Sequence, residues 1–120
     1  MTLLSFATTV EEGIAVVSLE GELDVAGAEL LEQELARIGG DPACRGLVLD
    51  LSRLEFMDST GLRLVVLADA RARENGRPLV LVRAGESVQR VFEMTRMDDR
   101  LRFEATASDA VQAARQGGGR

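Results

Sequence analysis

The run from Asp58 to Gly61, which reads Asp-Ser-Thr-Gly, is the part of this sequence best suited to chemistry. It precedes a segment with helical spacing, so its hydroxyls stand at a predicted helix start. A phosphate on Ser59 would bring a charge of about −1.5 to −2 close to free backbone N–H groups and the positive end of the helix dipole. Arg63 shares the helical face of Ser59 and could approach that phosphate, whereas Asp58 would repel it. Because these effects are small and opposed, the domain should tolerate phosphate at Ser59 without refolding.

The same run has a simpler structural interpretation. Asp58 or Ser59 can cap the helix with a side-chain oxygen, and Thr60 can occupy the first turn. One cap does not require Asp, Ser, Thr and Gly together, however. Gly61 lowers helix propensity by about 1 kcal/mol relative to Ala, and its missing Cβ would let another backbone or side chain approach Ser59 closely. On local evidence alone the capping interpretation is favoured, although the run also has the features of a contact surface or of a hydroxyl that must be reached.

The composition excludes most familiar catalytic machinery. The 120 residues contain no His and no Lys, and all 14 positive side chains are Arg. Without His there can be no Ser-His-Asp triad and no His-based zinc site, and without Lys there is no Schiff base or Walker-type phosphate lysine. The pair Asp98-Asp99 lacks the further carboxylates that a metal site needs. We expect no catalytic residues, no metal and no cofactor, and we predict that the chain is not an enzyme.

Charge and hydropathy narrow the choice of partners. The net charge of −6 would repel nucleic-acid phosphates, and no apolar run approaches the roughly 20 residues that span a bilayer. The single cysteine, Cys44, fits a reducing cytoplasm. Residues 1–36 hold eight acids and no base, which indicates either a solvated face or a docking surface for a basic protein partner. We expect a cytoplasmic protein that binds other proteins, with neither nucleic acid nor membrane as a direct partner.

The elements that position these residues alternate between strands and helices. Apolar and alternating runs predict strands at 4–10, 14–19, 46–51, 79–82 and 101–104. Helical spacing and capping residues predict helices at 24–39, 59–75, 86–95 and 106–115. This order predicts an α/β fold, a mixed sheet with parallel central strands flanked by about four helices. We expect a single domain over residues 1–115 and a disordered tail over 116–120.

Binding sites in such sheets concentrate on the loops that follow the carboxyl ends of parallel strands. Three strand-to-helix loops are predicted, at 20–24, 54–59 and 83–86, and parallel strands would place all three on one rim. Asp24 and Asp58 would then lie near Ser59. These two carboxylates could also serve a small ligand, a nucleotide or an enzyme, but no second catalytic element accompanies them. We interpret Met94 and Met97 as core packing at a helix end rather than as a contact surface.

Three blocks of residues resemble one known family in their order and spacing. They are Gly21 to Asp24, Leu49 to Leu51 with Phe56 to Leu62, and Val88 to Thr95. The Asp-Ser-Thr-Gly-Leu segment after a predicted buried strand is the most specific of them. The blocks resemble the STAS domain and, more narrowly, the bacterial anti-sigma factor antagonists of sporulation and general stress control. The resemblance runs from about Leu4 to Ala114 and implies the STAS-type fold.

The resemblance implies a regulator that switches partners. In that family the unphosphorylated antagonist binds an anti-sigma factor that is also a serine kinase of the GHKL ATPase type, and binding frees a sigma factor. The kinase phosphorylates the serine after the motif Asp, which corresponds to Ser59, and the complex dissociates. A PPM-type metal-dependent phosphatase restores the serine. The family's Asp that shapes the nearby surface corresponds to Asp24. The implied partner-binding residues are Asp24, Asp58, Ser59, Thr60, Gly61 and Arg63.

The sequence departs from the family pattern at two positions, Arg63 and Arg96. Small residues, often Gly, are common there, so both arginines change the surface charge near the expected interface and bear on partner identity more than on fold. Two alternative functions stay open. The chain could be a STAS scaffold that is never phosphorylated, such as a stressosome-type subunit or an accessory of a lipid-transport complex. From a different class, it could be a small-ligand or nucleotide-binding domain.

Overall fold

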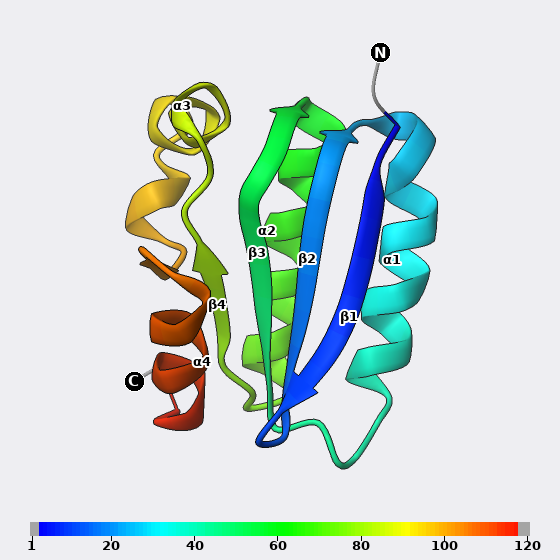
Figure 1. Ribbon diagram of the computed structural model, residues 1–120, viewed down its shortest axis with the longest axis vertical. Coiled ribbons are helices and arrows are strands. Elements are labelled where there is room, and N and C mark those ends of the chain that lie inside the picture. Colours follow the sequence, from blue (N-terminus) through cyan, green and yellow to red (C-terminus); the bar gives the residue numbers. More distant parts are fainter. Residues whose placement is uncertain (1–2, 118–120) are drawn as a thin grey trace.

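The computed structural model describes residues 3–117 and contains one five-stranded sheet in the order β1-β2-β3-β4-β5 (Figure 1). The strands are β1 (Ser5–Glu11), β2 (Ile14–Leu23), β3 (Gly46–Met57), β4 (Leu79–Val82) and β5 (Phe103–Glu104). The helices are α1 (Val25–Gly39), α2 (Ser59–Glu74), α3 (Glu86–Met94) and α4 (Ala107–Arg115), with a short 3-10 helix, η1 (Met97–Asp99). Of the tail predicted at 116–120, residues 118–120 lie outside the described range.

β1 and β2 form an antiparallel hairpin because the two residues between them adopt left-handed backbone conformations. Glu12 has φ of 54° and Gly13 has φ of 83°, and Glu11 faces Ile14 in the register. A two-residue turn with positive φ at both positions matches the twist of the strands that it joins. The hairpin makes β1 an edge strand and starts the parallel part of the sheet at β2.

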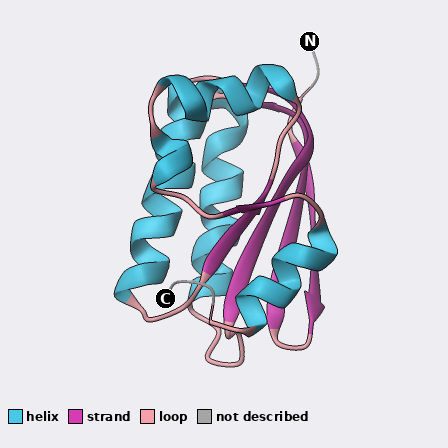
Figure 2. Ribbon diagram, turned by 90° about the vertical axis from the view of Figure 1, so that its left-hand side faces the viewer, coloured by secondary structure: helices cyan, strands magenta, loops and turns pink. Residues whose placement is uncertain are grey.

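From β2 onward the strands are parallel, since β2 pairs with β3, β3 with β4 and β4 with β5. Parallel neighbours need crossover connections, which the helices supply. Helices α1 and α2 cover one face of the sheet, and α4 covers part of the other (Figures 1 and 2). This arrangement confirms the predicted α/β fold, with a mixed sheet, parallel central strands and four α-helices over residues 3–117.

β2 and β3 are longer than the sequence predicts. β3 continues through Met57 instead of ending at 51, and α2 begins at Ser59, so only Asp58 of the loop predicted at 54–59 lies between the two elements. The pairing of β2 with β3 shifts register twice, and β3 carries the additional residues. These bulges leave Leu51, Leu54 and Met57 buried at every third position, which hides the two-residue alternation typical of a strand. β2 likewise extends to Leu23, so only Asp24 of the loop predicted at 20–24 lies between β2 and α1.

Two apolar clusters hold the layers together. The larger lies between the sheet and helices α1, α2 and α3. The smaller joins α4 to the first residues of β2 and β3 and to β4. Met97 packs against the larger cluster as predicted, but Met94 is 78% exposed, so its assignment to the core is wrong. Met94 follows the buried Phe92 by two residues, which turns it roughly 200° away around α3. No helix within the described range is long and apolar enough to cross a membrane.

Candidate functional site at the carboxyl ends of the strands

Two chain segments meet where β2 and β3 end, and the loop after β4 climbs toward α3 at the same end of the sheet (Figure 1), although β4 itself stops beside Asp50 of β3. We call this end of the sheet the carboxyl rim and define it by residues 23–25, 56–61 and 83–86. Leu23 and Met57 pair in register, so Asp24 and Asp58 follow them at equivalent points of neighbouring strands. The Asp58 N–H also donates to the carbonyl oxygen of Leu23, with an N···O distance of 3.3 Å. The structure thus brings Asp24 and Asp58 to one rim, as parallel strands require.

Asp58 caps α2, so the hydroxyl of the neighbouring Ser59 is not needed for the cap. Its Oδ1 accepts a hydrogen bond from the N–H of Gly61 at 3.0 Å, a type of cap that stabilises a helix by about 1 kcal/mol. Ser59 is the first residue of α2, and its side chain is exposed. Within residues 3–117 the Ser59 hydroxyl makes no hydrogen bond, whereas Thr60 is half-buried. The capping role therefore falls to Asp58, and the Ser59 oxygen faces solvent at the helix start.

Gly61 is buried and lets α2 approach the end of the sheet closely. A Cβ placed on Gly61 would lie 2.7 Å from Cγ of Met57 and 2.8 Å from both Cγ and the carbonyl oxygen of Leu23. Real Cβ atoms do not tolerate such distances from backbone, so the glycine is needed for packing. Gly61 thus acts on the Ser59 surface indirectly, because it fixes the position of the helix that carries the hydroxyl.

The start of α1 resembles that of α2. Oδ1 of Asp24, which is half-buried, accepts a hydrogen bond from the N–H of Ala26 at 3.1 Å. Large apolar side chains are exposed nearby: Val25 at 71% and Phe56 at 47%. Exposed aromatic and aliphatic side chains around a polar centre are typical of surfaces that bind protein. The carboxyl rim therefore combines two capped helix starts with an apolar border.

A buried glutamine positions the third segment of the rim. Oε1 of Gln89 accepts a hydrogen bond from the N–H of Ala84 at 3.0 Å, and the side chain is only 3% exposed. This contact holds the loop between β4 and α3. Sequence reasoning did not identify Gln89, because a single polar residue inside a helical pattern indicates a solvent-facing position. Its place four residues after Gly85 is the signal that could have indicated a contact back to the loop.

The two arginines that depart from the family pattern are both exposed. Arg63 forms no hydrogen bond or ion pair within the described part of the chain, although it stands one helical turn after Ser59. Arg96 adopts a left-handed backbone conformation with φ of 62°, just before η1. Glycine adopts this conformation without strain, which is the physical reason for a glycine preference at such a position. The structure does not bring Arg96 into the carboxyl rim as defined above.

The largest electrostatic perturbation lies on α1 rather than at the rim. Two hydrogen bonds from Arg37 and one from the Thr8 hydroxyl lower the pKa of Glu34 to about 2, although burial acts in the opposite direction. This contact ties α1 to the edge strand β1. Within residues 3–117, no group of three His, Cys, Asp or Glu side chains is arranged to hold a metal ion. The rim offers an accessible hydroxyl, that of Ser59, beside the exposed side chains of Val25 and Phe56.

Known proteins resemble this chain along nearly its whole length. The STAS domain model matches residues 5–110. The chain is 30% identical over 105 residues to the anti-sigma-F factor antagonist RsfB of Mycobacterium tuberculosis. The aligned region covers 88% of this chain and 84% of RsfB. An anti-sigma factor antagonist from Mycobacterium paratuberculosis has the same fold with a TM-score of 0.84 and 30% identity, over 94% of this chain and 95% of that one. The unphosphorylated form of SpoIIAA shares the fold with a TM-score of 0.80 and 24% identity, over 93% of this chain and 97% of that one. The phosphorylated form of Bacillus SpoIIAA has a TM-score of 0.72 and 23% identity, over 90% of this chain and 97% of that one.

Proposed function

Because this chain belongs to the STAS domain family and is, by homology, an anti-sigma factor antagonist, we propose that it is a phosphorylation-controlled partner switch. Members of this family are non-enzymatic regulators, in agreement with the prediction that the chain is not an enzyme. Its partner is an anti-sigma factor. In the proposed cycle the unphosphorylated chain binds that factor through the carboxyl rim, and binding releases a sigma factor for transcription.

The proposed acceptor of the phosphate is Ser59, and its exposure at the start of α2 is the observation that carries the proposal. A kinase needs a hydroxyl that it can reach, and Asp58 rather than Ser59 supplies the helix cap. Phosphate at this position would be favoured by roughly 0.3–1 kcal/mol through the helix dipole. The existence of SpoIIAA structures in both phosphorylation states supports a modification that leaves the fold in place.

The switch acts at the interface rather than inside the domain. A surface shaped around the neutral Ser59 hydroxyl would have to bury an unpaired dianion once the serine carries phosphate. Weakening a complex from micromolar to millimolar requires about 4 kcal/mol, which such desolvation can supply. The exposed Val25 and Phe56 would provide apolar contacts around the hydroxyl, and Arg63 would influence which partner fits.

The enzymes of the cycle follow from the family resemblance. The anti-sigma factor is proposed to be a serine kinase of the GHKL type that phosphorylates Ser59 with its own ATP. A PPM-type phosphatase is proposed to remove the phosphate. Control of sporulation or of a stress response is the corresponding biological setting.

The experiment is capture of partners from the native cell on immobilised chain, followed by addition of ATP and phosphopeptide mapping. We expect an anti-sigma factor to be captured, and we expect ATP to release it while Ser59 becomes phosphorylated. Ser59→Ala should capture the same factor and hold it after ATP is added. Ser108, which is also exposed in the first turn of a helix, serves as an internal control that should stay unmodified.

Two outcomes would overturn the proposal. If the captured kinase leaves the chain unmodified and binding is unaffected by ATP, the chain is a constitutive STAS scaffold. If the phosphate is found on Thr60 alone, the switch exists but Ser59 is not its acceptor.

A further inference from the structure

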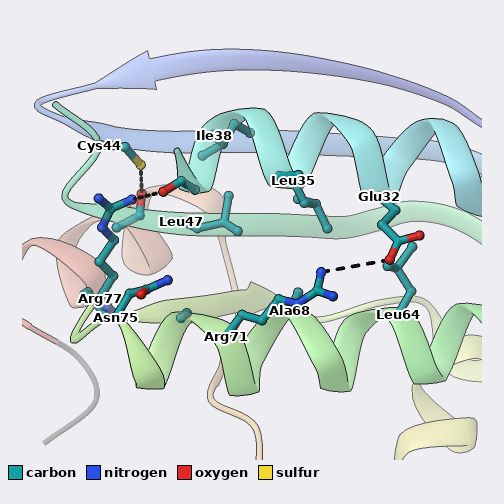
Figure 3. Close-up of a pocket in the computed structure, with 15 residues that line it drawn as sticks. Glu32, Leu35, Ile38, Cys44, Leu47, Leu64, Ala68, Arg71, Asn75 and Arg77 are labelled. Carbon is teal, nitrogen blue, oxygen red and sulfur yellow. Dashed lines mark hydrogen bonds and ion pairs between the residues drawn. The ribbon is translucent and has the colours of Figure 1, made fainter. Parts of the chain in front are cut away.

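A cavity of about 460 Å³ lies between α1 and α2, against the start of β3 (Figure 3). We call it the α1–α2 groove. It extends toward the opposite end of the sheet from the carboxyl rim, because its lining includes Gly39, the last residue of α1, and Ala72 in the last turn of α2. Small-molecule sites typically enclose roughly 300–1,000 Å³ and are mostly apolar. The walls fit that description, and they include Leu35, Ile38, Leu47, Leu64, Ala68 and Pro78.

Two polar contacts join the sides of the groove. Nη1 of Arg71 in α2 lies 3.9 Å from Oε2 of Glu32 in α1. Nη1 of Arg77, between α2 and β4, donates to the carbonyl oxygen of Gly39 at 2.9 Å. Figure 3 shows Arg77 toward one end of the groove and Glu32 toward the other, with Leu35 and Leu47 between them. The space is therefore elongated and apolar along its length, with a charged group near each end.

Arg77 differs from Arg71 in lacking a counterion. Arg71 faces Glu32, whereas Arg77 forms no ion pair with any residue from 3 to 117. Arg77 is half-buried, and its hydrogen bond to Gly39 uses one of five guanidinium N–H donors. Arginine pairs with carboxylates through two parallel hydrogen bonds, so a carboxylate entering the groove would supply both a counterion and acceptors. The charge at this end of the groove thus selects an anionic head group.

We propose that the α1–α2 groove binds a medium-chain fatty acid, with its carboxylate on Arg77 and its alkyl chain against Leu35, Leu47 and Leu64. A flexible alkyl chain suits walls without aromatic side chains. A nucleotide fits less well, because it would require a stacking surface and more than one unpaired cation. The site is separate from Ser59, so the proposal does not depend on the partner switch.

The test is a titration of the full chain with sodium decanoate, kept below the concentration at which it forms micelles. Calorimetry should show saturable binding of one molecule per chain, and NMR should show shifted amide signals confined to the groove, including those of Leu47 and Ala68. Arg77→Gln should weaken binding by about tenfold or more, since it removes a charged hydrogen-bond donor. Arg53→Gln removes the same charge from an exposed position on β3, outside the groove, and should bind like the wild type.

Two further comparisons complete the test. Ala68→Phe should fill the groove and abolish binding, with circular dichroism used to verify that the variant is folded. Decanol, which has the same chain without the charge, should bind about tenfold more weakly than decanoate. Absence of saturable binding, shifts located at the carboxyl rim, or equal affinity for decanol and decanoate would each overturn the proposal. If Ala68→Phe does not fold, the Arg77→Gln and decanol results decide. Ser59→Ala should bind decanoate normally, which separates this site from the switch.

Discussion

Helices α1 and α2 begin at equivalent points of two neighbouring strands, and an aspartate caps each of them, yet the two starts present different surfaces. Asp24 is followed by the exposed, apolar Val25, whereas Asp58 is followed by Ser59. The same cap chemistry therefore places an exposed hydroxyl next to the cap at only one of the two helices. The difference lies in the residue that follows the capping aspartate.

The two helices are also fastened to the sheet by different means. Gly61 packs α2 against backbone and side-chain atoms of two strand ends, whereas Gly27 of α1 faces only the side chain of Leu4. α1 is tied to β1 by the hydrogen bonds that Glu34 accepts from Thr8 and Arg37. Close packing holds one helix, and polar contacts near the surface help to hold the other. The Ser59 hydroxyl is consequently carried by the helix that approaches the strand backbone more closely.

The largest expected effect concerns which helix start the kinase recognises. Val25→Ser in a Ser59→Ala background gives α1 an Asp-Ser start and removes the serine from α2. We expect no phosphate transfer to this double variant and normal transfer to the wild type, measured with radiolabelled ATP and the purified cognate kinase. Phosphorylation of the introduced serine would show that an Asp-Ser cap alone is sufficient, which would remove the distinction between the two helices.

The next effect is on affinity for the anti-sigma factor. Ser59→Asp should weaken binding by about a hundredfold, equivalent to about 3 kcal/mol, because a carboxylate imitates part of the charge of a phosphate. Ser108→Asp adds the same charge at the start of α4 and should change the affinity by less than about threefold. Isothermal titration of both variants measures the difference. Equal losses would mean that net charge, rather than position, controls binding.

Alanine substitutions at Gly61 and Gly27 should distinguish packing against strand backbone, at Gly61, from packing against a side chain, at Gly27. Gly61→Ala should destabilise the fold by about 2 kcal/mol, since its Cβ would meet the Leu23 carbonyl oxygen and overpacking typically costs about 1–3 kcal/mol. Gly27→Ala should cost less than Gly61→Ala, about 1 kcal/mol or less, because the added Cβ would meet Leu4, which precedes the paired residues of β1, and Ala favours the helix. Urea unfolding of both variants gives the comparison. The packing argument fails if Gly27→Ala is the more destabilising.

The smallest expected effect is a pH dependence of the free energy of unfolding that arises from Glu34 in α1. The pKa of Glu34 is lowered from 4.5 to about 2 in the folded chain, so its stabilising contribution is present above pH 4.5 and is lost as the pH falls toward about 2. Glu34→Gln should therefore cost about 1 kcal/mol at pH 7, a value that reflects partial exposure to water, and progressively less in acid. Urea unfolding at several pH values measures this trend. The exposed Glu29, changed to Gln, is the matched control and should show no such loss.

The general architecture was predictable because it depends on local patterns. Capping residues and helical spacing placed a helix start at Ser59, and the apolar runs around Val48 and Val80 indicated strands covered on both faces. The division of roles between Asp58 and Ser59 was not predictable, because either side chain can cap a helix. Only the hydrogen bond from Gly61 to Asp58 assigns the cap.

Features that depend on contacts between distant parts of the chain could not be predicted from the sequence. The bulges in β3 arise from its pairing with β2, so nothing local to residues 52–57 indicates a strand. The exposure of Met94 depends on which face of α3 meets the sheet. Likewise, Leu35 and Arg77 are far apart along the chain, and their meeting in one groove follows from the spacing of α1 and α2.

Cys44 lines the α1–α2 groove, its thiol lies 3.2 Å from the carbonyl oxygen of Gly46, and it is the sole cysteine of the chain. Attachment of a maleimide dye would consequently label one known place without any engineered substitution. A fluorophore there would report occupancy of the groove in real time, while the opposite end of the molecule stays unlabelled for measurements on Ser59. The protein thus carries its own reporter position for asking whether events at its two ends influence one another.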